Sequence, residues 1–139
     1  MVEIGWVRAA LLAGAVGVVA MPVARAGNCG VESTQAGMND CAFRELKAAD
    51  AALNAAYRQI MARLSGQTEA RQLLTAAQRA WVAFRDAECK FSASGVQGGS
   101  IQPMIASMCQ TDLTKARTEA LRRHLDCKEG DLGCPVPAQ

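Results

Sequence analysis

Residues 46–64, LKAADAALNAAYRQIMARL, decide the fold of this chain. Apolar residues recur in it every three or four positions, at Leu46, Ala49, Leu53, Ala56, Ile60 and Leu64. This spacing places them on one stripe of an α-helix. Asn39 is a suitable N-cap with Asp40 in the first turn, and Ser65-Gly66 supplies a stop signal. We therefore predict a helix over about residues 39–64.

Two further helical patterns follow this one. The second covers about residues 69–91, with Thr68 as its cap, and its expected core stripe is Leu74, Ala77, Trp81, Phe84 and Glu88. The third covers about residues 103–126, begins near Pro103, and carries Met104, Met108, Leu113, Ala116, Ala120, Leu121 and Leu125. No alternating strand pattern is present, and the Gly- and Pro-containing tail, residues 127–139, is not helical. The sequence predicts an all-α fold, a small up-down-up three-helix bundle stapled by disulfides.

The first 26 residues have the form of a secretory signal peptide. Arg8 precedes an apolar run over residues 9–20, and the segment ends in the small-x-small pattern Ala24-Arg25-Ala26. The run is too short to span a bilayer, which disfavours a membrane anchor. Asn28 before Cys29 does not fit a lipid-attachment site. We expect a mature domain over residues 27–139, secreted or periplasmic, with no membrane span after signal removal.

The charge balance of the mature chain excludes several classes of partner. Removing the leader leaves 13 Lys and Arg against 12 Asp and Glu, a net charge of +1. This value predicts no nucleic-acid binding and no strong attraction to anionic lipid. The mature 113 residues suit one small domain whose thin core needs disulfides, each contributing roughly 2–4 kcal/mol.

All six cysteines follow the leader, at Cys29, Cys41, Cys89, Cys109, Cys127 and Cys134. In an up-down-up bundle the last two lie at one end and are expected to pair. The other four lie at the opposite end, where we favour Cys29–Cys41 with Cys89–Cys109. The alternative, Cys41–Cys89 with Cys29–Cys109, stays open. Without a Cys-x-x-Cys motif, and with a single histidine, neither a zinc site nor a redox dithiol is indicated.

Several polar residues and Trp81 lie on or beside the helix faces that carry the apolar stripes: Asp50, Asn54, Tyr57, Gln78, Trp81, Arg85, Thr114 and Arg117. Mirroring the helices about their connections predicts that Asn54, Gln78 and Thr114 form one polar layer. Tyr57 and Arg117 are expected in the next layer. Buried polar groups of this kind are normally paired and specify packing, whereas exposed ones form a binding surface. No nucleophile–base set, metal-ligand set or cofactor motif is present, so we expect no enzyme and no cofactor.

The order of these residues is similar to a known family. The chain contains Met38-Asn39-x-Cys41, Asp50-x-x-Leu53-Asn54-x-x-Tyr57, Gln78-x-x-Trp81-x-x-x-Arg85-Asp86-x-x-Cys89 and Thr114-x-x-Arg117. This pattern resembles the lysozyme-inhibitor LprI-like N-terminal domain family from Cys29 to about Cys127. The resemblance implies a small, helical, disulfide-linked, exported bacterial domain. It also implies binding and inhibition of lysozyme at the cell envelope.

Two functions are therefore compared. In the first, the domain inhibits lysozyme-type muramidases by inserting the loop over residues 92–102, in which Gly95, Gln97, Gly98, Gly99 and Ser100 are the candidate contacts. Many lysozymes are strongly basic, so a charge of +1 gives no steering unless the fold gathers an acidic patch. In the second, the domain is a periplasmic binding or structural module for another envelope protein or a toxin. Both functions require a protein partner, and the sequence leaves the oligomeric state open.

Overall fold

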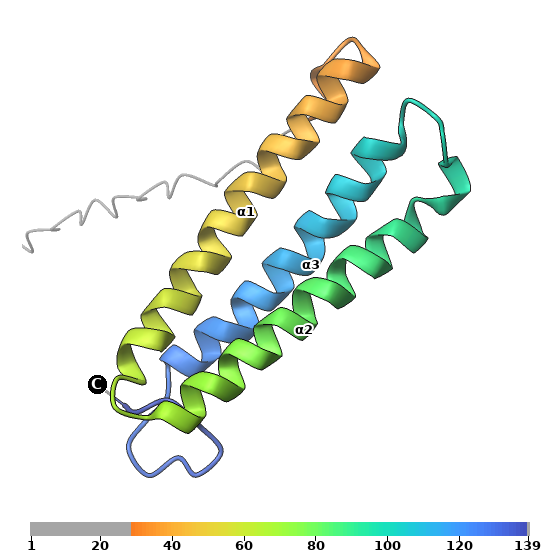
Figure 1. The fold of residues 1–139 in the computed structure, drawn as a ribbon. Helices are drawn as coiled ribbons and strands as arrows, with labels where there is room; N and C mark the ends of the chain where they lie inside the picture. The colour runs from red at the N-terminus through yellow and green to blue at the C-terminus, as the bar shows by residue number, and fades with distance from the viewer. Residues whose placement is uncertain (1–28, 139) are drawn as a thin grey trace, which may run out of the picture.

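The computed structural model describes residues 29–138, so the predicted signal peptide lies outside the described residues. Within them the chain forms α1 (Gln35–Arg63), α2 (Thr68–Ser92) and α3 (Gln102–Leu125). Two short 3-10 helices, η1 (Cys29–Val31) and η2 (Ser94–Val96), precede α1 and follow α2, and this part of the chain contains no strand. The helices run up, down and up (Figure 1), which confirms the predicted fold class.

The start of α1 differs from the sequence-based prediction. The helix begins at Gln35, four residues before Asn39, because Thr34 is the N-cap and its Oγ1 accepts a hydrogen bond from Gly37 N at 3.0 Å. Satisfying a free backbone N–H in this way is what fixes a helix start. The expected cap, Asn39, lies inside the helix, where its side chain is available for a contact described below.

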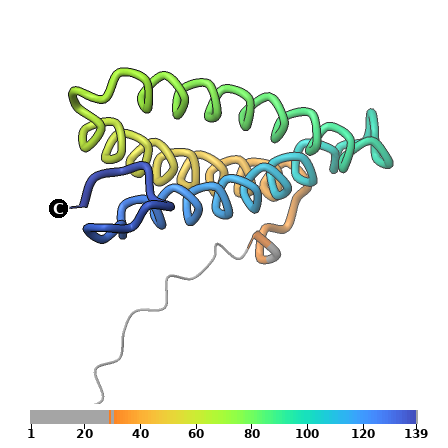
Figure 2. Tube along the Cα trace, turned by 90° about the horizontal axis from the view of Figure 1, so that it is seen from below, coloured from red at the N-terminus to blue at the C-terminus, as the bar shows by residue number. Residues whose placement is uncertain are grey.

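Helices α1 and α3 form the most extensive helix pair, and they lie side by side in both views (Figures 1 and 2). The α1 stripe is buried as predicted, at Ala42, Leu46, Ala49, Leu53, Ala56 and Ile60. Alanine alternates with a larger apolar residue along this stripe. Small side chains allow two helix backbones to approach closely, so the packing of α1 favours a partner face that is also small.

That partner face on α3 is a stripe of four hydroxyl residues followed by one leucine: Ser107, Thr111, Thr114, Thr118 and Leu121. The predicted α3 stripe was wrong at two of its members, because Met108 and Ala116 are exposed. Thr111 Oγ1 donates to Ser107 O, and Thr118 Oγ1 to Thr114 O, each at 2.8 Å. Threonine can bond the carbonyl four residues earlier and so bury its hydroxyl without a partner on another helix.

Helix α2 is less deeply packed than the other two. Cys89 is its one buried residue, and Leu74 and Trp81 are partly buried against the core. The predicted stripe was wrong at Ala77, Phe84 and Glu88, which are all exposed. Thr68 is the first helical residue rather than the cap. The inward face of α2 is therefore shifted by one residue from the predicted stripe. Gln78, Arg85 and Cys89 lie on it in place of Ala77, Phe84 and Glu88.

The tail closes the end of the bundle that holds the α1–α2 turn (Figure 1). Val136 is buried in the main apolar cluster, beside Ile60 and Leu121. The disulfides Cys29–Cys41, Cys89–Cys109 and Cys127–Cys134 are present, as favoured from the sequence. Among residues 29–138, no helix combines the length and the apolar character that crossing a membrane requires.

Candidate functional site

The guanidinium of Arg85 joins all three helices. The side chain comes from α2 and is only 11% exposed. Its Nη1 donates to Asp50 Oδ1 on α1 at 2.8 Å and to Thr114 Oγ1 on α3 at 3.1 Å. The guanidinium also lies 5.3 Å from the centre of the Trp81 ring, within the range of a cation–π contact. Arg85 is therefore the central residue of a polar network that crosses the bundle.

Other predicted polar residues extend this network along α2. Asp86 Oδ1 accepts from Arg85 Nε at 3.0 Å and from Gln110 Nε2 at 3.1 Å. Seven residues before Arg85 on α2, about two turns away, Gln78 Oε1 accepts from Arg117 Nε of α3 at 3.2 Å. Burial lowers the pKa of Arg117, because the charged form of the guanidinium is poorly solvated there.

The predicted layers are wrong in their register. Asn54 is exposed, and Gln78 bonds to Arg117 rather than to Thr114. Tyr57 OH lies 3.1 Å from Thr75 Oγ1, and the expected meeting of Tyr57 with Arg117 stays a prediction. The mirrored arrangement treats the three helix pairs alike. In the structure, α1 and α2 pack less closely than α1 and α3, and long side chains such as Arg85 and Tyr57 bridge the distance between them. Thr75 and Gln110 were missed, although Thr75 lies three residues before Gln78 on the same face.

Most of this network is directed inward and its groups satisfy one another. Arg85 is nearly buried, Thr114 is fully buried, and Asp50 keeps 38% of its side chain exposed beside the guanidinium. The described chain leaves no buried side-chain nitrogen or oxygen without a hydrogen bond. Such a closed network holds the three helices in register and thereby positions the ends of the bundle.

One end of the bundle carries the connection between α2 and α3, and we call this end the loop end. Residues 92–102 are anchored there at several points. Cys89–Cys109 closes the base, and Ala93 is buried. Asn39 Nδ2 donates to Ser100 O at 2.9 Å, which fixes the loop to α1. Gly98 N donates to the side chain of Gln102 at 2.9 Å.

The anchored loop presents its predicted contact residues to solvent, and all five are exposed: Gly95, Gln97, Gly98, Gly99 and Ser100. Gly98 has φ of 77°, a conformation that residues with a Cβ rarely adopt. No charged residue occurs between Lys90 and Asp112. The loop is therefore an exposed, uncharged element rich in backbone and amide groups.

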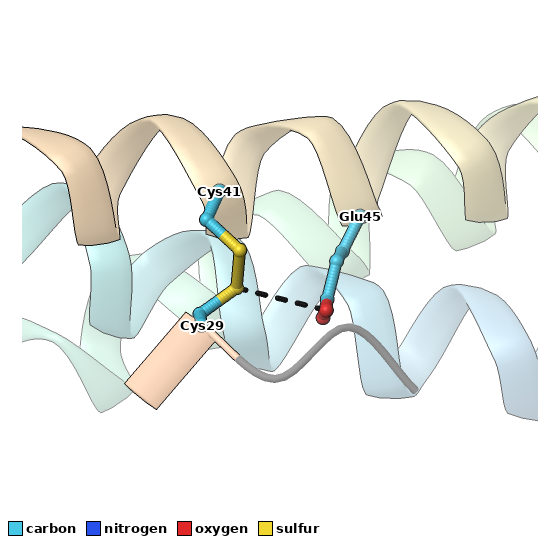
Figure 3. Close-up of side chains that lie close together, drawn as sticks. All are labelled: Cys29, Cys41 and Glu45. Carbon is cyan, nitrogen blue, oxygen red and sulfur yellow. Dashed lines mark hydrogen bonds between the residues drawn. A yellow bond between two sulfur atoms is a disulfide. The ribbon is translucent and has the colours of Figure 1, made fainter. Parts of the chain in front are cut away.

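The start of the described chain completes the loop end. Cys29–Cys41 holds η1 against α1, and Glu45 Oε1 lies 3.6 Å from Cys29 Sγ (Figure 3). A disulfide sulfur carries no hydrogen, so this is a close contact rather than a hydrogen bond. The same disulfide removes the thiolates that a metal would need, although these three residues are close enough to share an ion.

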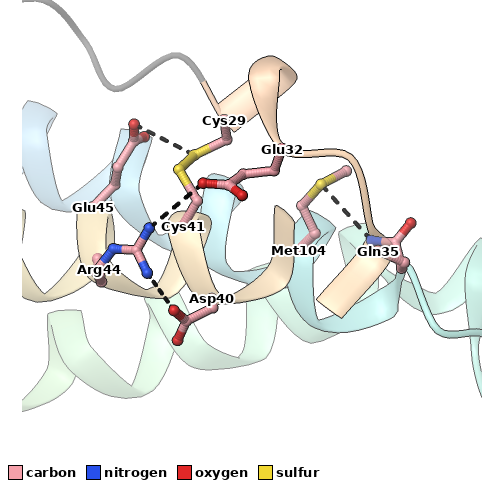
Figure 4. The surroundings of a disulfide bond; sticks show 8 residues. All are labelled: Cys29, Glu32, Gln35, Asp40, Cys41, Arg44, Glu45 and Met104. Atoms are coloured by element: carbon pink, nitrogen blue, oxygen red, sulfur yellow. Dashed lines mark hydrogen bonds and ion pairs between the residues drawn. A yellow bond between two sulfur atoms is a disulfide. The ribbon is translucent and has the colours of Figure 1, made fainter. Parts of the chain in front are cut away.

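Carboxylates surround this disulfide (Figure 4). Arg44 pairs with Asp40, and its Nη2 lies 4.0 Å from Glu32 Oε1. Among residues 29–138, no basic side chain lies within ion-pair distance of Glu45. One arginine thus serves two carboxylates here, and negative charge remains in excess.

The same imbalance extends over the whole half of the bundle that carries the loop. Residues 29–50 and 81–113 contain seven carboxylates and four basic side chains, whereas residues 51–80 and 114–138 contain five and nine. The half with the loop therefore has a charge of −3 and the half with the tail has +4. Residues 29–138 are therefore near neutral as a whole but strongly dipolar, with the uncharged loop inside the acidic half.

Comparison with known proteins identifies the family of the chain. The sequence profile of the family described as lysozyme inhibitor LprI matches residues 27–121. The chain belongs to this family. The match includes the polar network and the loop, and ends before the Cys127–Cys134 disulfide of the tail.

One relative of this LprI-family chain is an uncharacterized protein of Rhizobium meliloti (strain 1021). The two are 33% identical over 113 residues, which cover 73% of this chain and 81% of the relative. No solved structure matches the chain.

Proposed function

We propose that this LprI-family domain is an exported, non-enzymatic inhibitor that binds lysozyme-type muramidases. The loop over residues 92–102 docks in the glycan-binding cleft of the enzyme and excludes the substrate. The observation that carries the proposal is the loop itself, which is exposed, uncharged and anchored by Cys89–Cys109, Ala93 and Asn39.

The chemistry of the loop suits a site that binds a glycan chain. Such a site recognises hydroxyl and acetamide groups through hydrogen bonds. Gln97 and Ser100 present an amide and a hydroxyl, and the glycines between them leave backbone N–H and C=O groups accessible. Because the loop is fixed before it docks, little conformational entropy is lost on binding.

The charge distribution supports the same partner. A net charge of +1 gives no steering toward a basic enzyme, but the half of the bundle with the loop has −3. A dipolar inhibitor approaches a basic surface with its acidic end first, which raises the association rate. The loop lies within that end, so electrostatic orientation also aligns the contact residues.

The test is lysis of Micrococcus-type cell walls by several lysozymes in the presence of the oxidised protein, residues 27–139. The loop variant is Gly98→Val, and the matched control is Gly130→Val in the tail. Both glycines have positive φ, of 77° and 83°, and neither has a heavy atom within 4 Å of an added Cβ. The backbone strain is therefore similar, and only the distance from the proposed contact differs.

We expect the wild-type protein and Gly130→Val to inhibit equally, and Gly98→Val to lose about tenfold in affinity, which corresponds to roughly 1.4 kcal/mol. Raising the salt concentration should slow association with basic lysozymes. Absence of inhibition at large molar excess against every lysozyme tested would overturn the proposal. Equal loss in the two glycine variants would remove the loop from it.

A further inference from the structure

Helix α2 carries a second apolar stripe, on a face that points away from the core. Its members are spaced alternately by four and three residues and are all exposed: Leu73, Ala77, Ala80, Phe84, Ala87 and Phe91. We call this the α2 stripe. Exposed fractions reach 74% for Phe91, 65% for Leu73 and 53% for Phe84. Alternating steps of four and three are the spacing of a helix that packs along another helix.

Packing among residues 29–138 does not bury the α2 stripe. The inward face of α2 contains Leu74, Trp81 and Cys89, and these residues meet the core, the Arg85 network and the disulfide to α3. The three large members of the stripe expose on the order of 400 Å² of apolar surface. Continuous exposed patches of this size on small proteins usually bind something.

We propose that the α2 stripe binds the same stripe of a second copy of this chain, antiparallel, about a two-fold axis next to Val82. This axis places Phe84 opposite Ala80 of the second copy, and Leu73 opposite its Phe91. Each large side chain at the centre thus meets a small one, as knobs-into-holes packing requires. A two-fold interface must complement itself in this way, because both copies contribute the same residues.

A parallel pair would lack this fit. It would place Phe84 on Phe84 and Ala80 on Ala80, which alternates crowding with gaps. It would also bring Glu88, which adjoins the α2 stripe, against Glu88 of the second copy. In the antiparallel pair Glu88 is level with Ala76 of the second copy, so that like charges do not meet.

The area of the contact sets its strength. With the three alanines included, two copies of the α2 stripe bury on the order of 1,000 Å² in total, which is the lower limit for specific interfaces. We therefore expect a reversible dimer with a dissociation constant in the micromolar range. The antiparallel arrangement directs the two loop ends away from each other, so the dimer leaves both loops free. The inference does not depend on lysozyme being the partner of the loop.

Sedimentation velocity on the oxidised protein, residues 27–139, tests the inference over concentrations from low to several hundred micromolar. The disrupting variant is Phe84→Glu, and the matched control is Phe43→Glu. The two phenylalanines are similarly exposed, at 53% and 49%, but Phe43 lies on α1. Phe91→Glu, in the more exposed end of the α2 stripe, is a second variant in case Phe84→Glu does not fold.

We expect the wild-type protein and Phe43→Glu to form dimers with the same dissociation constant. Phe84→Glu and Phe91→Glu should stay monomeric or weaken the dimer more than tenfold, with helical circular dichroism unchanged. A wild-type protein that remains monomeric at the highest concentration would refute the inference. So would a dimer that Phe84→Glu and Phe91→Glu both leave intact.

Discussion

Replacing Arg85 with alanine should destabilise the bundle more than any other exchange of a charged residue in the described chain. The guanidinium contacts α1, α2 and α3 together, through Asp50, Trp81 and Thr114. The alanine variant loses these contacts at once, and it also leaves the Thr114 hydroxyl without the donor that it now has. The prediction therefore tests whether the network is what holds α2 against the other two helices.

The magnitude follows from the burial of the groups. A hydrogen bond to a charged group contributes about 1.5–3 kcal/mol, but Asp50 is 38% exposed, so water replaces part of it and about 1 kcal/mol is expected. The contact with Trp81 adds about 0.5–1 kcal/mol. The aliphatic stem of a side chain that is 11% exposed adds roughly 1 kcal/mol. The sum is about 3 kcal/mol, or a melting temperature lower by roughly 10–15 °C.

Urea unfolding followed by circular dichroism measures this change, with two further variants to divide it. Arg85→Met keeps an apolar stem and should recover about 1 kcal/mol of the loss. Arg85→Lys keeps the charge but not the planar fork, and should fall between Met and wild type. A double-mutant cycle of Arg85→Met with Asp50→Asn should give a coupling energy of about 1 kcal/mol. A loss below about 0.5 kcal/mol in Arg85→Ala would show that the network contributes little to stability and refute this reasoning.

Three other changes test separate features of the fold. Replacing Cys89 and Cys109 together with serine should lower the free energy of unfolding by about 3 kcal/mol, from closure of a loop with a sequence separation of 20, and should weaken inhibition in the wall-lysis assay. Ala56→Leu should cost about 1–3 kcal/mol in urea unfolding, because the α1–α3 contact has no space for the larger side chain; a neutral effect would argue against close packing there. The free energy of unfolding of Arg117→Met, measured by thermal melting, should lie within about 1 kcal/mol of the wild-type value. The variant loses the hydrogen bond to Gln78, but it no longer has to bury the charge whose desolvation lowers the arginine pKa.

The sequence predicted α1 well because its buried stripe is apolar. Leu46, Leu53 and Ile60 recur with helical spacing, and such a signal is read directly. The α3 stripe was found only in part: Leu121 was predicted, but Thr111 and Thr118 are polar by composition and bury their hydroxyls by bonding their own backbone. A hydropathy pattern does not contain that information.

The candidate site was predicted in content but not in register. Arg85, Asp50 and Thr114 were all named from their helix faces, yet the expected layer joined Thr114 to Asn54 and Gln78 instead. The offset arises because long side chains reach across the gap between α2 and α1, and sequence spacing does not report the distance between helix axes. The uneven distribution of charge could not be predicted from the composition either, because it appears only when the helices are placed side by side.

The disulfide map has a consequence for how the protein matures. The six cysteines are bonded in consecutive pairs along the chain: Cys29 to Cys41, Cys89 to Cys109, and Cys127 to Cys134. An exported polypeptide enters the oxidising compartment with its N-terminus first, so each thiol meets its native partner before the cysteines of the next pair arrive. Oxidation in order of emergence therefore yields the native map without reshuffling, which is otherwise slow. In the fully reduced chain all six thiols compete at once, and this advantage is lost. The order in which the cysteines become available therefore helps to determine the native disulfides.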